Sequence, residues 1–182
     1  MILELLPGRQ RGLRGAPAAP RSVVHTWRGI ALNGIAQGYI TDRVADLLRK
    51  EGLDDVLVDL GEIRGLGRHA DGRPWTVGLK DPLEPARIVD TLTLENRALA
   101  SSAGSATRFD AGGRHHHLFD PHSGASSNRY LGITVIAPTA TTADALSTGF
   151  ASMDVGEVKK VLQFFPSVTA RITTSAGEVV TL

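Results

Sequence analysis

Hydrophobic positions recur with two different periods along the chain, and together they predict a mixed fold. From Gly34 to Lys50 the apolar residues fall at helical spacing, and Gly52 follows as a helix stop. Helices are also predicted at 141–153 and 155–165, and a closing hairpin at 167–182. Alternating or continuous apolar runs predict strands at 56–60, 75–79, 87–94, 98–102, 114–119 and 131–138. We therefore expect an α+β fold in which helices flank a mainly antiparallel sheet.

Composition adds several exclusions to this pattern. The chain has 182 residues, of which 42% are apolar, so it is long enough to bury a substantial core. No apolar run reaches the roughly 18 residues of a membrane-spanning helix, and we find no signal peptide, so we expect the chain as it stands to be cytoplasmic. The absence of cysteine excludes disulfides and thiolate metal sites. A net charge of +1 produces no overall field that would favour nucleic acid.

The first 22 residues differ from the rest in composition. Arginine, glycine and proline predominate there, which is typical of a flexible, solvated basic arm and less often of a phosphate-binding one. We therefore divide the chain into an arm at 1–22 and a folded domain at 23–182.

The segment ADALST at 143–148 is the strongest local candidate for chemistry. On a helix, Asp144 and Thr148 are four residues apart, so both side chains project from one face. A carboxylate and a hydroxyl suit Mg²⁺, which keeps several waters or phosphate oxygens as further ligands. The alternative is structural, because Thr141 and Asp144 also have the spacing of a helix capping box.

Two further segments are weaker candidates. In RHHHLF at 114–119, a strand would place His115 and His117 on one face, as a transition-metal pair, although surface or core histidines are the more common explanation. Gly34 and Gly38 begin the first helix, where backbone N–H groups can approach a phosphate or where another helix can pack closely.

Six segments in order resemble one family. They are 34–42, 58–63, 74–82, 98–103, 117–124 and the ADALST segment at 143–148. Together they resemble the C-terminal portion of the ApbE family, the FAD:protein FMN transferases. The resemblance covers about residues 23–182. It implies the α+β architecture of the ApbE family, which is similar to the T-fold.

The resemblance implies a magnesium-dependent transfer of FMN from FAD to a threonine hydroxyl of a target flavoprotein, with release of AMP. It implies Mg²⁺ contacts from Asp144, Thr148 and the backbone carbonyl of Gly34. His117 would be the general base beside the flavin and phosphate. The residues expected to line the FAD site are Ala31, Gln37, His117 and Leu118.

The chain departs from the family pattern at two positions and in length. Gln37 replaces a lysine that would offer phosphate a positive charge, and Ala31 replaces an aspartate. The N-terminal half of the family domain is absent, which would leave sheet edges and apolar surface uncovered. Three alternatives would explain the short length. The chain is a truncated reading frame, it pairs with a second chain or copy that covers the missing half, or it is a shortened homologue that closes its own sheet.

Two other functions stay open at this point. The chain could be an inactive flavin-binding module that needs a separate N-terminal half, or a metal-binding protein that uses the histidines. Family members are often periplasmic or membrane-anchored, which leaves the location undecided.

Overall fold

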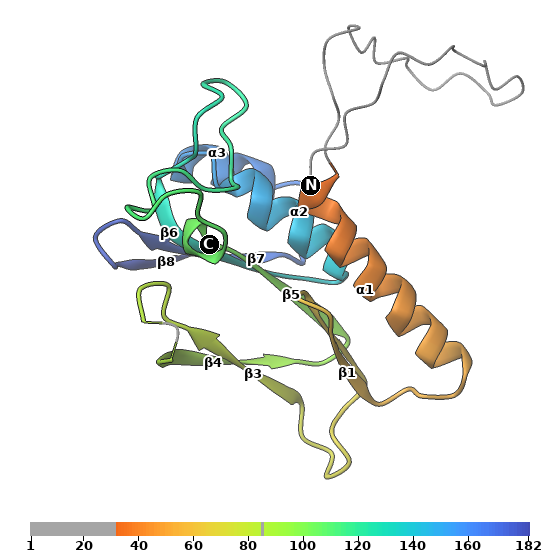
Figure 1. Ribbon diagram of the computed structural model, residues 1–182. Coiled ribbons are helices and arrows are strands. Elements are labelled where there is room, and N and C mark those ends of the chain that lie inside the picture. The colour runs from red at the N-terminus through yellow and green to blue at the C-terminus, as the bar shows by residue number, and fades with distance from the viewer. Residues whose placement is uncertain (1–31, 85) are drawn as a thin grey trace, which may run out of the picture. The chain divides into compact units, whose positions relative to one another are not determined.

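A six-stranded antiparallel sheet carries three helices on one face and a two-stranded ribbon on the other (Figure 1). The computed structural model describes residues 32–84 and 86–182, and all structural statements below concern these residues. The strands of the large sheet are, in spatial order, β1 (Val56–Asp59), β2 (Ile63–Leu66), β5 (Arg97–Ser102), β6 (Tyr130–Ala137), β7 (Thr169–Thr174) and β8 (Val179–Thr181). Each neighbouring pair is antiparallel, so the predicted α+β class is confirmed.

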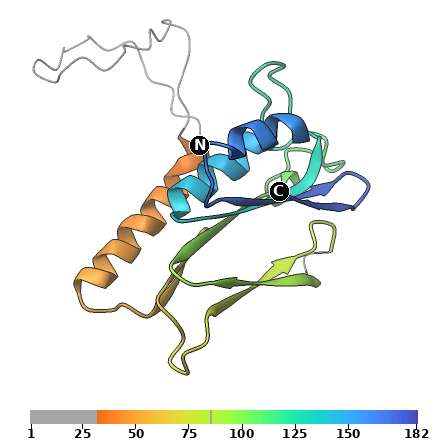
Figure 2. The same cartoon turned by 180° about the vertical axis from the view of Figure 1, so that it is seen from behind.

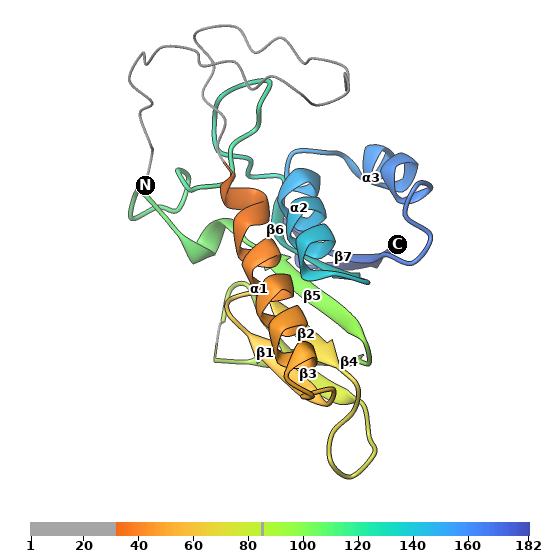
Figure 3. The same ribbon diagram turned by 90° about the vertical axis from the view of Figure 1, so that its right-hand side faces the viewer.

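Local sequence signals explain where the three helices begin. They are α1 (Asn33–Lys50), α2 (Ala140–Phe150) and α3 (Val155–Leu162). The hydroxyl of Thr139 accepts the Thr142 N–H and so caps α2, while Asp154 and Glu157 form a reciprocal capping box at α3. α1 and α2 lie side by side over the sheet, as Figure 2 and Figure 3 show from two further directions.

The sheet separates an apolar face from a polar one. Alternate residues of the central strands are buried beneath α2 and α3, where they pack against Phe150 and Val158; they are Ala100, Val135, Ala137, Ala170 and Ile172. The intervening residues, such as Ser101 and Thr134, point to the opposite face and bond to each other at 2.9 Å. Period-two alternation in the sequence therefore predicted a real division between core and solvent-facing surface.

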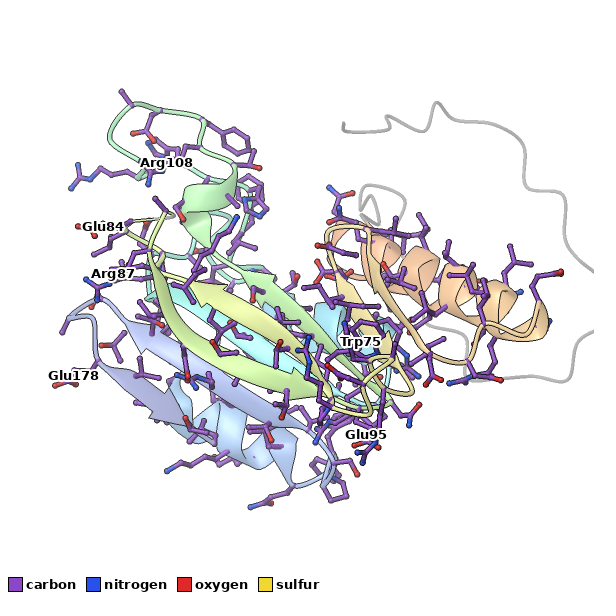
Figure 4. All side chains as sticks on the ribbon, turned by 90° about the horizontal axis from the view of Figure 1, so that it is seen from below. Trp75, Glu84, Arg87, Glu95, Arg108 and Glu178 are labelled. Atoms are coloured by element: carbon purple, nitrogen blue, oxygen red, sulfur yellow. The ribbon has the colours of Figure 1, made fainter. Side chains whose placement is uncertain are left out.

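A two-stranded β-ribbon partly covers the polar face. Its strands are β3 (Trp75–Lys80) and β4 (Ile88–Leu94). Trp75, labelled in Figure 4, ties the ribbon to the sheet because its indole Nε1–H donates to the Leu66 carbonyl at 2.8 Å. Between ribbon and sheet lies a cavity of about 490 Å³, with Ser101, Thr134 and Arg171 among its lining residues.

One strand prediction was wrong, and one strand was missed. Residues 114–119 form only two isolated bridges, Arg108 with His116 and Phe119 with Ser126. They pair with nearby residues of the same loop and not with a strand of the sheet. β2 was missed because its four residues include a glycine and an arginine, which do not look like a strand. Gly65 suits this position, because a Cβ would make a tight contact of 3.2 Å with the Leu94 side chain. None of the described helices has the length and hydropathy needed to cross a membrane.

Candidate functional site

The candidate site lies where α1 and α2 approach each other most closely. A Cβ on Gly38 would lie 2.3 Å from the carbonyl oxygen of Ala140, and one on Gly34 would lie 2.6 Å from Thr148 Cγ2. Glycines at these two positions, one helical turn apart, therefore allow α2 to pack directly on the α1 backbone. The structure brings together Gly34, Asp144 and Thr148, the three residues proposed as metal ligands from the sequence.

Asp144 takes no part in a helix cap. Thr139 caps α2, and the Asp144 carboxylate instead accepts the backbone N–H of Gly38 at 2.9 Å, across the helix interface. The side chain is buried, and this burial raises the pKa of its carboxyl, while the bond from Gly38 partly opposes the rise. The capping alternative is therefore excluded, and a buried carboxylate is presented to α1.

The bond from Gly38 also affects the backbone of α1. In a regular helix the Gly38 N–H would donate to the carbonyl of Gly34, four residues earlier. Here it donates to Asp144, and Gly34 has non-helical torsions (φ −85°, ψ 16°) that kink the first turn of α1. The Gly34 carbonyl thus belongs to a distorted turn of the helix, at the residue whose Cα side is packed against Thr148.

Small hydroxyl side chains connect α2 to the sheet below the site. Ser102, at the end of β5, lies 2.8 Å from the Ser147 hydroxyl and 3.4 Å from that of Thr148. Ser102 also lines the cavity under the ribbon. The Ser102 and Ser147 hydroxyls had no role in the sequence prediction, because only the fold brings 102 next to 147.

A second buried carboxyl was also missed. Glu62 lies in the turn between β1 and β2, is only 7% exposed, and its Oε2 has no hydrogen-bond partner among the described residues. Burial, then the charges of Asp144 and Asp59, raise the pKa of Glu62 to about 7, against a small opposing effect of the Ser101 backbone N–H. The sequence places an acid next to Gly61, but its burial depends on contacts distant along the chain.

Gln37 and Asp42 extend from α1 in two directions. The Gln37 amide lies beside Gly61, where a Cβ would come within 3.0 Å of its Nε2. Asp42 accepts the N–H groups of Ala140 and Thr141 at 2.9 and 2.8 Å, and so stabilises the N-terminus of α2 from the neighbouring helix. Asp42 therefore fixes the position of α2 relative to α1.

The histidine segment lies in a loop. His116 is buried with its ring against Gly104, whereas His117 is exposed, with Nδ1 3.3 Å from the carbonyl oxygen of Thr107. Leu118 is 8% exposed and belongs to the core cluster beneath α2. Within the described residues His117 forms no hydrogen bond to α2, and no three His, Asp or Glu side chains gather as a metal cluster.

Two sequence predictions lie outside the described residues. They are the flavin contact at Ala31 and the basic arm at 1–22. Gln37, His117 and Leu118 lie within the described residues, and their proposed contacts with FAD stay predictions.

Comparison with known proteins finds one family throughout. The ApbE family model matches residues 20–172. FAD:protein FMN transferases from Haemophilus influenzae and Treponema pallidum are 37% and 31% identical over 66% and 87% of the chain, which spans 36% and 50% of their lengths. Among solved structures, the ApbE protein of Thermotoga maritima has a TM-score of 0.75 at 33% identity, over 83% of this chain and 50% of its own. The flavin transferase ApbE of Vibrio cholerae has a TM-score of 0.68 at 28% identity, over 82% and 48%.

Proposed function

Because the chain belongs to the ApbE family, we propose that it takes part in the magnesium-dependent transfer of FMN from FAD to a threonine hydroxyl of an acceptor flavoprotein. The observation that supports this most is the contact of α1 with α2, which gathers oxygen donors around a buried carboxylate. The chain spans about half the length of the relatives or less, so the proposal concerns this portion of the transferase, to which we assign the cation and the pyrophosphate.

The donor set fits Mg²⁺. Asp144 and Thr148 supply a carboxylate and a hydroxyl, and the Gly34 carbonyl, at the kink in α1, is the third oxygen. Hard cations with few protein ligands take their remaining ligands from water and substrate phosphate, which agrees with a site of only two side chains. Bound Mg²⁺ would neutralise the charge of the FAD pyrophosphate.

Gln37 of α1 lies next to Gly61, in the turn between β1 and β2. Its exposed amide can donate to a phosphate oxygen, and the adjacent Gly61 offers no side chain that would obstruct it. Because an amide carries no charge, we expect Gln37 to orient the pyrophosphate and to contribute less binding energy than a lysine.

His117 is the proposed general base. A carbonyl oxygen can only accept a hydrogen bond, so the contact with Thr107 places the ring proton on Nδ1 and leaves Nε2 free to accept one. In the proposed step the threonine oxygen bonds to the FMN-side phosphorus, its proton passes to His117, and the bond to AMP breaks. The product is a phosphoester of FMN, and Leu118 anchors the loop in the core next to this residue.

The test is AMP release from FAD and MgCl₂ in the presence of a threonine-containing acceptor, followed by chromatography. The wild-type chain should release AMP, and Asp144→Ala should not. Asp46→Ala is the matched control, because Asp46 is an exposed aspartate on α1. Flavin retention without AMP from any variant would replace the proposal with a flavin-binding module.

A further inference from the structure

Glu62 is a buried acidic side chain with no compensating charge. In the described part of the chain no lysine, arginine or histidine lies within ion-pair distance of it, and its Oε2 accepts no hydrogen bond. Ionised side chains are rarely retained in such an environment unless they are paired or coordinate a cation, because removing the charge from water is costly.

The fold places Glu62 beside the proposed cation site. Ile63, the next residue, pairs with Leu99 of β5, and β5 ends at Ser102, whose hydroxyl contacts Ser147 and Thr148 of α2. The turn also carries Gly61, which touches Gln37 of α1. Glu62 therefore lies in a turn whose flanking residues, Gly61 and Ile63, contact α1 and β5.

Two further carboxylates raise the pKa of Glu62. The charge of Asp144, on α2, raises it more than that of Asp59, the last residue of β1, does. Two carboxylates that face each other repel, and a divalent cation between or beside them would remove the repulsion.

We propose that Glu62 is a positioning residue of the cation site, where its carboxylate accepts hydrogen bonds from the waters that Mg²⁺ retains. The inference rests on the proposed function, because it takes Asp144 and Thr148 as the direct ligands. Among the described residues, Asp59, Glu62 and Asp144 do not gather as a metal cluster, so the contact is proposed through water and not as a direct bond. Partners of this kind typically change metal affinity by about 10- to 100-fold.

The experiment measures Mn²⁺ affinity by electron paramagnetic resonance at pH 8, with the unfolding temperature of the metal-free protein recorded in parallel. Glu62→Gln should weaken Mn²⁺ binding about 10-fold, and Glu62→Asp, which keeps the charge, should recover most of it. Glu178→Gln is the control, because Glu178 is an exposed acid in the turn between β7 and β8 (Figure 4). The Glu62→Gln chain should unfold at an equal or higher temperature without metal, since a buried negative charge is removed.

The outcomes separate this inference from the proposed function. If wild type binds Mn²⁺, Asp144→Asn loses it and Glu62→Gln binds as wild type does, the role of Glu62 is overturned and the proposed site stands. If Glu62→Gln lowers both the affinity and the metal-free unfolding temperature, Glu62 is structural and the inference is overturned. If wild type binds no Mn²⁺, both fail.

Discussion

Replacing Gly38 with alanine tests whether the close approach of α1 and α2 builds the site. The added methyl would lie 2.3 Å from the Ala140 carbonyl oxygen and 2.7 Å from Asp144 Cβ. Since a carbon and an oxygen normally approach no closer than about 3.3 Å, α2 would have to withdraw by roughly 1 Å.

The expected cost follows from three effects. Forcing a methyl into a packed interface costs about 1–3 kcal/mol. Weakening the buried Gly38 N–H bond to Asp144 costs about 1.5–3 kcal/mol more, whereas alanine returns about 1 kcal/mol of helix propensity. We expect Gly38→Ala to lower the free energy of unfolding by about 1.5–5 kcal/mol and to weaken Mn²⁺ binding.

Gly149→Ala is the matched control within α2. A Cβ there would have nothing within 4 Å, so the substitution should raise stability by up to about 1 kcal/mol and leave Mn²⁺ binding unchanged. Urea unfolding followed by circular dichroism measures both variants. Equal stability of Gly38→Ala and Gly149→Ala, with intact metal binding by both, would refute the reasoning.

Three other predictions concern the side chains around this contact. Thr148→Val, nearly identical in shape, should weaken Mg²⁺ binding about 10-fold in calorimetry, and a large fall in the metal-free unfolding temperature would instead assign Thr148 a structural role. Gln37→Lys should raise FAD affinity in a flavin fluorescence titration because it adds a charge facing phosphate, and unchanged or weaker binding would place Gln37 away from it. The pKa of Glu62 is raised from 4.5 to about 7, so its carboxyl is held protonated in the folded chain. The free energy of unfolding of the metal-free wild type should therefore fall as the pH rises from 4.5 through 7. Glu62→Gln should remove that loss, worth at most about 3 kcal/mol at pH 8, and parallel stability–pH curves for the two proteins would contradict the assignment.

Periodicity predicted most of the secondary structure. The helix begun by Gly34 and the alternating strand 131–138 need only local contrast between apolar and polar positions, and both are present. Residues 114–119 show the same contrast, with His116 and Leu118 buried and their neighbours exposed, yet they lie in a loop. Alternation reports which side chains are buried, and it cannot say whether a neighbouring strand is available to pair.

The site was predicted less completely than the fold. The spacing of Asp144 and Thr148 predicted that both lie on one face of a helix, but it did not distinguish a helix cap from a pair of metal ligands. That distinction depends on the cap formed by Thr139 and on the N–H of Gly38, which is distant in sequence. Glu62 was missed for a related reason, since its burial depends on how β5 and α1, distant in sequence, pack against the turn.

The most direct test of the central claim is an anomalous difference map from crystals of the chain grown with FAD and MnCl₂. The account predicts a manganese peak in bonding contact with the Asp144 carboxylate and the Thr148 hydroxyl, next to the Gly34 carbonyl and the FAD pyrophosphate. A peak at the histidines of 115–117, or ordered FAD with no peak between α1 and α2, would contradict it.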